Sequence, residues 1–172
     1  SAGTNATLVE ALKIENDAIE TIRVTSAEEM YNAAHEYFDK CDVAILSAAV
    51  ADYRPSEIAS EKIKKKDDTL TLQLTKTKDI LASLGAIKKK QYLVGFALET
   101  QNEEENAKLK LKKKNLDLIV LNSLRDEGAG FQTDTNKITL IAKDNKMLPF
   151  PVKPKNEVAK DILEFIIEQT NA

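Results

Sequence analysis

The sequence has one cysteine and one histidine among its 172 residues, and this scarcity excludes several kinds of site. A single cysteine, Cys41, cannot form a disulfide within the chain and is typical of proteins of the reducing cytosol. Because it ends an amphipathic helical pattern, we expect a buried structural thiol. With His35 as the only histidine, a zinc site of the usual ligand type is not credible. A Ser-His-Asp triad would also need His35, which lies on the polar, solvated side of that helix without a catalytic motif around it.

Long apolar runs and a strong net charge are missing as well. No run approaches the roughly 18 apolar residues that span a bilayer, and residues 1–5 show no basic segment before an apolar core that would indicate a signal peptide. The formal charge of −3 favours neither a nucleic acid nor a membrane as partner. With 42% apolar and 31% charged residues, we expect one globular, cytoplasmic domain over residues 1–172.

Hydrophobic periodicity predicts alternating strands and helices along most of the chain. Ser26 and Glu29 form a capping box that opens an amphipathic helix, and Thr100 and Glu103 form a second one ahead of a lysine-rich helix. The expected strands cover 19–24, 42–49, 69–74, 92–98 and 116–121, followed by a hairpin of 138–141 and 147–150; a short helical pattern lies at 8–14, and helices are expected near 80–85 and 158–166. This order predicts a Rossmann-like α/β fold, with a mainly parallel sheet flanked by helices and an antiparallel hairpin near the C-terminus.

Polar residues follow three of the expected strands where each ends. The carboxyl ends of parallel strands share one edge of a sheet, so these residues are expected to converge on a ligand site. A lysine-rich loop there could close over phosphates, although a solvated charge run is the simpler interpretation of such lysines. Solvation is also the simpler interpretation of residues 88–90 and of Lys110 and Lys114, which share a helix face. Phe96 taken alone is more typical of a core residue. Neither G-x-G-x-x-G nor G-x-x-x-x-G-K-[ST] occurs, so a standard dinucleotide or P-loop cradle is unsupported.

Several motifs nevertheless agree in order and spacing with those of one enzyme family. They are Ala48-Ala49-Val50-Ala51-Asp52-Tyr53-Arg54-Pro55, Glu61-Lys62-Ile63-Lys64-Lys65, Gly95-Phe96-Ala97-Leu98-Glu99-Thr100, the Lys110/Lys114 helix and the loop Gly130-Phe131-Gln132-Thr133-Asp134-Thr135-Asn136. From about Val24 to its end, the chain resembles bacterial phosphopantothenoylcysteine synthetase (phosphopantothenate–cysteine ligase), the ligase domain of a bifunctional coenzyme A biosynthesis protein. The resemblance implies that the carboxylate of 4′-phosphopantothenate attacks the α-phosphate of CTP, and that the cysteine amine then displaces CMP from the acyl-cytidylate.

By position, the resemblance also implies which residues form the site. Lys62 resembles the family's flap lysine and is the catalytic residue that we expect, because it contacts phosphate and closes over the intermediate. Ala49 and Asn122 are expected to contact the substrate. Lys78 stands where the family often has proline, and Ser123 replaces an aspartate. The expected nucleotide contacts are Leu46, Ser47, Ala48, Asp52, Lys62, Lys78, Asp79, Ile80, Leu81, Phe96, Lys110 and Lys114.

The resemblance further implies Mg²⁺ bound with the triphosphate, a homodimer whose active sites draw on both subunits, and fusion to or association with phosphopantothenoylcysteine decarboxylase. It does not indicate which residues would bind the metal. The family's N-terminal segment, which holds the substrate phosphate, is not legible in residues 1–23 and is expected to be missing. A non-catalytic nucleotide-binding or dimerisation module is therefore an alternative. ATP in place of CTP is a weaker one, against which the bacterial-looking Lys62-Ile63-Lys64-Lys65 argues.

Overall fold

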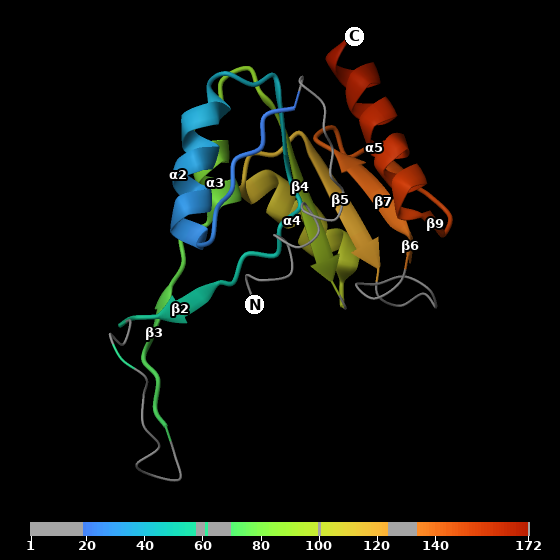
Figure 1. Cartoon of the computed structure of the whole chain (residues 1–172). Coiled ribbons are helices and arrows are strands. Elements are labelled where there is room, and N and C mark those ends of the chain that lie inside the picture. Colours follow the sequence, from blue (N-terminus) through green and yellow to red (C-terminus); the bar gives the residue numbers. More distant parts are fainter. Residues whose placement is uncertain (1–18, 58–60, 62–69, 100, 124–133, 172) are drawn as a thin grey trace. The chain divides into compact units, whose positions relative to one another are not determined.

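The computed structural model describes residues 19–57, 61, 70–99, 101–123 and 134–171 (Figure 1). The chain divides into two compact units, of which the first takes Ser1–Glu36 and Ala48–Ile80 and the second takes Tyr37–Ser47 and Leu81–Ala172. Each unit is described separately below. The helical pattern at 8–14, the lysines at 62 and 64–66 and most of the loop at 130–136 lie outside the described residues. No helix in the described ranges is long and apolar enough to cross a membrane.

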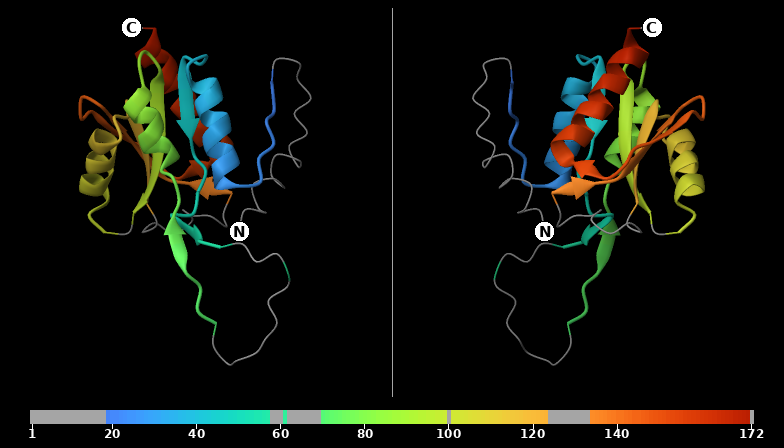
Figure 2. Two further views of the ribbon diagram at one scale, coloured as in Figure 1. Left: turned by 90° about the vertical axis from the view of Figure 1, so that its left-hand side faces the viewer. Right: turned by 90° about the vertical axis from the view of Figure 1, so that its right-hand side faces the viewer.

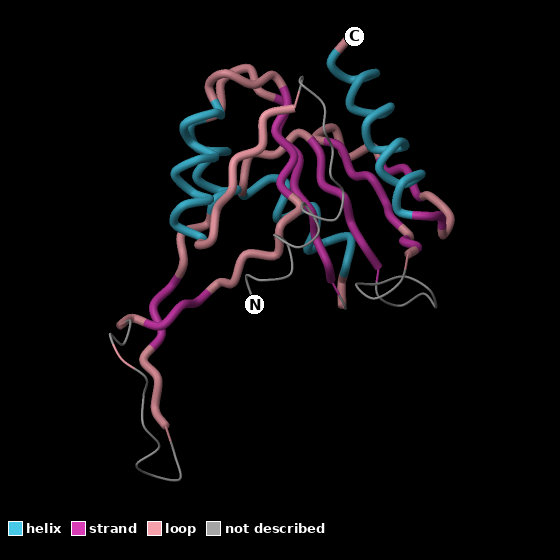
Figure 3. Tube along the Cα trace, in the orientation of Figure 1, coloured by secondary structure: helices cyan, strands magenta, loops and turns pink. Residues whose placement is uncertain are grey.

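The second unit is built on a five-stranded mixed sheet with the order β1-β4-β5-β7-β8 (Figures 1 and 3). The strands β1, β4 and β5 are parallel to one another, whereas β7 and β8 continue the sheet antiparallel. The strand bounds are Val43–Leu46 for β1, Tyr92–Glu99 for β4, Leu118–Ser123 for β5, Ile138–Ala142 for β7 and Met147–Pro149 for β8. The expected α/β fold, including its antiparallel hairpin near the C-terminus, is confirmed.

Helices cover both faces of this sheet (Figure 2). The helix α4 (Glu103–Lys113) packs on β4 and β5, and α5 (Lys155–Thr170) covers the opposite face. Alternate residues of the strands point to α5, because successive side chains of a strand point to opposite faces. They build a buried core with the apolar side of that helix, made of Val94, Leu118, Val120, Ile138, Leu140, Ala142, Val158, Ile162, Phe165 and Ile166.

Two glycines allow α3 (Ile80–Ile87) to approach the elements beside it. A Cβ on Gly95 would come within 2.6 Å of Leu81 and 2.9 Å of Leu116, so the missing side chain makes room for two core leucines. A Cβ on Gly85 would come within 1.9 Å of the Lys114 carbonyl oxygen. The close contact between α3 and the end of α4 therefore requires glycine at position 85.

The first unit contains most of α2 (Ala27–Phe38) and a two-stranded ribbon of β2 (Tyr53–Pro55) and β3 (Leu74–Lys76). The predicted capping box of α2 is confirmed. The amide of Glu29 donates to Ser26 Oγ at 3.1 Å, and the Ser26 amide donates to Glu29 Oε2 at 3.3 Å. The amide of Thr25 also donates to that carboxylate at 2.6 Å, and these hydrogen bonds lower the pKa of Glu29.

Predicted strands at 19–24 and 69–74 are wrong. Residues 19–24 form no strand, and Ile19 and Ile22 are exposed. The strand expected at 69–74 begins only at Leu74, and Leu70, Leu72 and Leu74 are all exposed. Among the described residues of this unit, no third layer covers these leucines. The strand β2 was missed because its short sequence contains proline and reads as loop.

The second unit corrects further expectations. The strand β1 is an edge strand with Ile45 41% exposed, not a strand buried on both faces. The helix α4 begins at Glu103, and its N-cap is Asn102, whose φ of 46° lies in the left-handed region; Thr100 of the predicted capping box lies outside the described residues. Lys88 is also not solvated, because its ammonium contacts Asp117 Oδ2 at 2.6 Å and its side chain is only 7% exposed.

The histidine and the cysteine take part in local contacts. His35 is half-buried, with its ring stacked on Tyr31 at 4.0 Å and its Nδ1 donating to the Tyr31 carbonyl oxygen at 2.8 Å. The half-buried Cys41 thiol donates to the Phe38 carbonyl oxygen at 3.2 Å. Burial raises the pKa of Cys41, which agrees with the expected structural thiol.

Candidate functional site

In the second unit, the carboxyl ends of the three parallel strands lie along one edge of the sheet. Leu46 of β1 is opposite Gly95 of β4, so Ser47 follows at the same level as Phe96. Leu98 of β4 is in turn opposite Asn122 of β5. The sheet register therefore brings together the predicted residues 46–47, 96 and 122, which are far apart in the sequence. Ligands of open α/β sheets bind at this edge.

Lys110 of α4 reaches this edge. Its ammonium donates to the Phe96 carbonyl oxygen at 2.8 Å, and its side chain is half-buried. The strand β1 ends opposite Gly95, one residue before Phe96. The structure thus joins two residues that the family resemblance had each assigned to the nucleotide site. The Phe96 ring itself packs against the core under α5, in agreement with the core interpretation of this aromatic side chain.

Lys114 is the C-cap of the same helix and follows the last turn, which contains Lys110. Its amide donates to the Lys110 carbonyl oxygen at 3.0 Å, and its own carbonyl lies against Gly85. Asn115, with a φ of 52°, donates from Nδ2 to the Gly85 carbonyl oxygen at 2.9 Å. The contact between α3 and α4 therefore fixes the backbone at Lys114, whose side chain is half-buried.

Asn122 is held by a residue that the sequence analysis did not single out. Asn136, at the end of the short strand β6 (Thr135–Asn136), donates from its Nδ2 to Asn122 Oδ1 at 3.2 Å. Both side chains are half-buried. In the sequence, Asn136 belongs to the triplet Asp134-Thr135-Asn136, which was assigned to a loop. The position of Asn136 depends on pairing between β6 and β9 (Lys153–Pro154), two-residue strands that periodicity cannot detect.

Leu81 is the remaining predicted nucleotide contact in the second unit, and its side chain is in the core. In the first unit, Ile80 is buried likewise. A nucleotide could therefore meet these two residues only through their backbone. Asp79, which precedes them, has an exposed side chain.

The other predicted contacts belong to the first unit. Ala48, Ala49 and Asp52 are exposed, and the Val50 amide donates to the Ala48 carbonyl oxygen at 3.1 Å in a tight turn. The carbonyl oxygen of Asp52 accepts the Thr77 amide at 2.8 Å, which ties the Asp52 loop to the end of β3. The Thr77 hydroxyl is buried without a hydrogen-bond partner in the described part of the chain, a rare and costly state for a polar atom.

Lys78 contacts the first turn of α2. Its ammonium lies 2.7 Å from Glu28 Oε1 and 4.4 Å from the centre of the Tyr31 ring. The hydrogen bond to Glu28 raises the pKa of Lys78. Lys78 is more than half exposed, so this ion pair contributes little to stability.

Two further expectations concern Lys62 and a metal. Lys62 lies outside the described residues, although Glu61 beside it is described and exposed. Within the described ranges, no group of three or more His, Cys, Asp or Glu could hold a metal ion. The described side chains therefore do not form a Mg²⁺ site of their own.

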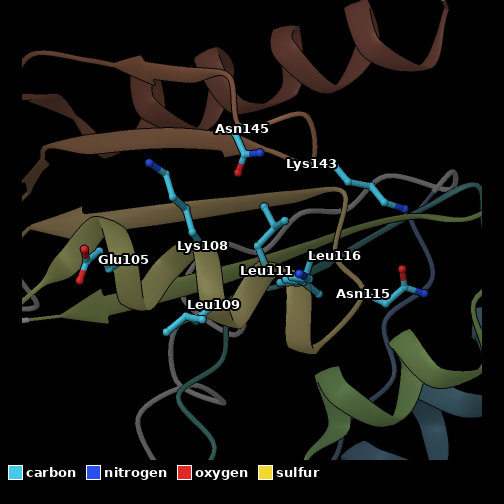
Figure 4. A pocket seen from close by; sticks show the side chains of 9 residues that line it. Glu105, Lys108, Leu109, Leu111, Asn115, Leu116, Lys143 and Asn145 are labelled. Atoms are coloured by element: carbon cyan, nitrogen blue, oxygen red, sulfur yellow. The ribbon is translucent and has the colours of Figure 1, made fainter.

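A hollow of 780 Å³ in the second unit lies away from the predicted residues (Figure 4). It runs between α4 and the turn from β7 to β8, and Asn145 and Lys143 face it from that turn. None of the predicted site residues lines it. Its lining residues are Glu105, Lys108, Leu109, Leu111, Lys112, Asn115, Leu116, Lys143 and Asn145.

Two curated proteins are similar to the chain over most of its length. A cysteine/cysteine sulfinic acid decarboxylase from an unknown prokaryotic organism is 50% identical over 169 residues, which cover 96% of this chain and 47% of that protein. The coenzyme A biosynthesis bifunctional protein CoaBC of Bacillus subtilis is 46% identical over 147 residues, which cover 86% of this chain and 36% of that protein. The chain thus spans less than half the length of these two relatives.

Solved structures agree with these similarities. The crystal structure of a CoaBC C-terminal domain matches with a TM-score of 0.71 and 40% identity, over 88% of this chain and 68% of that one. A Cab2 mutant in complex with phosphopantothenate-cysteine shares the fold, with a TM-score of 0.61 and 17% identity over 86% of this chain and 52% of that one. The family model for the DNA/pantothenate metabolism flavoprotein C-terminal domain matches residues 1–170, and the chain belongs to this family.

Proposed function

We propose that this chain is a phosphopantothenate–cysteine ligase domain that uses CTP, and that it works in coenzyme A biosynthesis in the cytoplasm. The observation that carries the proposal is the contact of Lys110 with Phe96 near the carboxyl end of β5, which contains Asn122. Two kinds of similarity support it: the CoaBC relatives are named for coenzyme A biosynthesis, and a structure with this fold holds phosphopantothenate-cysteine.

The proposed reaction has two steps. The carboxylate of 4′-phosphopantothenate attacks the α-phosphate of CTP and releases pyrophosphate, and the cysteine amine then attacks the acyl carbon and releases CMP. The substrate supplies the nucleophile, so no nucleophilic side chain is required. What the protein must provide is positioning and positive charge, on which nucleotidyl transfer mainly depends. Lys110, in the last turn of α4, supplies a cation held by the Phe96 carbonyl oxygen, and Lys114 at the C-cap of this helix is assigned as a second one.

Lys62 and Mg²⁺ complete the proposal. Lys62 is assigned to neutralise phosphate charge and to close over the acyl-cytidylate, on the resemblance alone. The metal would be held by the triphosphate, since the described residues offer no acidic cluster for it. The residues of this chain would then act on the metal only through the bound triphosphate.

Pyrophosphate release tests the proposal directly. It is measured with CTP or ATP, with and without 4′-phosphopantothenate and cysteine. Release that requires phosphopantothenate and prefers CTP is expected. Preference for ATP would refute the choice of nucleotide. No release despite CTP binding would leave the alternative, a non-catalytic nucleotide-binding module, in place of the ligase.

A pair of lysine variants tests the role of α4. Lys110→Gln removes a cation at the carboxyl edge, and a hydrogen bond to a charged group is worth about 1.5–3 kcal/mol. We expect kcat/KM for CTP to fall roughly 10- to 100-fold. The matched control is Lys112→Gln, which removes an exposed lysine of the same helix and should leave kcat/KM unchanged. Equal losses in both variants would mean that only net charge matters.

A homodimer is also part of the proposal. The ribbon of β2 and β3 exposes Tyr53, Leu70, Leu72 and Leu74, between 56% and 65% each. Two-stranded ribbons are marginally stable in water and gain from a further apolar layer. A second copy of the chain could supply that layer. Light scattering coupled to gel filtration should therefore give twice the mass of the chain, and a mass of one chain at high concentration would refute the dimer.

A further inference from the structure

The side chains of Asn122 and Asn136 form a pair with a defined direction at the carboxyl end of β5. Asn136 Oδ1 accepts the Lys137 amide at 3.0 Å, while Asn136 Nδ2 donates to Asn122 Oδ1 at 3.2 Å. The direction follows from the Lys137 backbone, because a backbone N–H can only donate. The oxygen of Asn136 must face it, so the amino group of Asn136 faces Asn122. Asn122 in turn must present its oxygen to Asn136.

This arrangement points the amino group of Asn122 away from Asn136. Among the residues that the structure describes, that amino group has no hydrogen-bond partner, although the side chain is half-buried. The two N–H donors of this half-buried amide are therefore available to solvent or to an acceptor of a bound ligand. Asn122 lies opposite Leu98, at the edge where Phe96 and Lys110 meet. A bound ligand at this edge could supply the missing acceptor.

The support for Asn136 is rigid. Asn136 pairs with Lys153 of β9, and the Lys155 amide donates to the Asp134 carbonyl oxygen at 2.9 Å. Lys153 is fixed to α5 by Asp161, whose two carboxylate oxygens lie 3.0 and 2.7 Å from its ammonium. Asn136 therefore stands on a framework that runs from α5 through β9 to β6. A side chain on such a framework is suited to orient another side chain.

We propose that Asn136 is a positioning residue, which holds the Asn122 amide so that its amino group donates to an oxygen of the acid substrate. That oxygen belongs to the carboxylate before activation and to the acyl carbonyl afterwards, where negative charge develops during attack by the amine. The proposal rests on the ligase function proposed above. Asn136 acts only through Asn122.

Asn136→Asp reverses the direction of the pair with little change in shape. One carboxylate oxygen still accepts the Lys137 amide, but the other is now an acceptor that faces Asn122. The Asn122 amide then rotates, so that its amino group donates to the carboxylate. Its oxygen, which can only accept, now faces the substrate in place of the amino group. We expect kcat/KM for 4′-phosphopantothenate to fall about 10-fold or more. The melting temperature should change little, because both hydrogen bonds of the pair persist.

Two further variants separate positioning from a structural role. In an Asn122→Ala background, Asn136→Asp should cause no further loss of kcat/KM, because its effect passes through Asn122. Asn156→Asp adds the same charge at an exposed position in the first turn of α5 and should leave activity unchanged. Additive losses in the double variant, or a loss of activity that only follows a loss of thermal stability, would overturn the proposal.

NMR of the side-chain amides supplies a readout that does not depend on turnover. The NH₂ signals of Asn122, assigned by their absence in Asn122→Ala, should shift on addition of 4′-phosphopantothenate to the wild type and not to Asn136→Asp. No shift in the wild type would overturn the role of Asn136. A shift without pyrophosphate release would support the positioning role and refute the ligase function, so the two failures are distinguishable.

Discussion

Gly85→Ala tests how the α3–α4 contact is built. Gly85 lies inside α3, where alanine would normally be favoured by about 1 kcal/mol because it loses less backbone entropy. Helix propensity alone therefore predicts that the substitution stabilises the protein. The contact with α4 predicts the opposite, since the new Cβ would lie 1.9 Å from the Lys114 carbonyl oxygen.

The size of the effect follows from the geometry. Real Cβ atoms essentially never approach a heavy atom closer than 3.0 Å, and the obstacle is backbone, so α3 has to move by about 1 Å in a close-packed interior. Overpacking of this kind costs about 1–3 kcal/mol. The shift also stretches the 2.9 Å hydrogen bond from Asn115 to the Gly85 carbonyl oxygen, at a cost of about 1 kcal/mol. After the gain in propensity, we expect a net loss of about 2 kcal/mol.

Thermal or urea unfolding followed by circular dichroism measures this loss. For a chain of this size, about 2 kcal/mol corresponds to a melting temperature lower by about 4–8 °C. The control is Ala86→Gly at the exposed neighbouring position, which should lose about 1 kcal/mol through propensity alone. A Gly85→Ala protein as stable as the wild type would refute the argument. It would mean that α3 moves away from α4 at no cost.

Two other predictions concern the amino edge of the sheet. Lys88→Met removes the ammonium that lies 2.6 Å from Asp117 and leaves this half-buried carboxylate with the Leu93 amide and, at 3.8 Å, the Lys143 ammonium, so it should cost about 2 kcal/mol in urea unfolding. Lys89→Met, at a side chain 73% exposed, should cost less than about 0.5 kcal/mol. Burial raises the pKa of Tyr92 to about 12, so the neutral phenol stabilises the fold fully below the usual Tyr pKa of about 10 and this contribution is lost as the pH rises through about 12. The loss of folding stability between these pH values should be smaller in Tyr92→Phe than in the wild type. An equal loss in both proteins would contradict the role of Tyr92.

The sequence predicted those parts of the fold in which the residues of the hydrophobic pattern are also buried. The apolar segment of β4 is buried on both faces, and the apolar face of α5 covers the core, so periodicity reported burial correctly. It failed in and before β3, where alternating leucines are exposed and no described part of this unit covers them. Alternation indicates which side chains share a face but not whether anything packs against that face.

The candidate site shows the same division. Phe96 and Lys110 were each assigned to the site by the family resemblance, and they meet because the strand and the helix that carry them follow each other directly. Asn136 could not be found this way. Its contact with Asn122 depends on the two-residue strands β6 and β9, which are too short to give a periodic signal. Of the two predicted capping boxes, the one of Ser26 and Glu29 is confirmed by both reciprocal bonds.

The lysines show why charge runs are hard to interpret without a register. Lys88 and Lys110 both had solvation as the simpler interpretation, yet each is held by a defined acceptor. The pairing of β4 with β5 separates them: Asp117 precedes β5 at the amino edge of the sheet, and its amide donates to the Leu93 carbonyl oxygen, whereas Lys110 donates at the carboxyl edge. Ligands bind at the carboxyl edge of such sheets. Variants at Lys88 should therefore change stability with little effect on kcat/KM, and variants at Lys110 should do the reverse. A Lys88 variant that loses activity while it remains folded would show that the two edges are coupled.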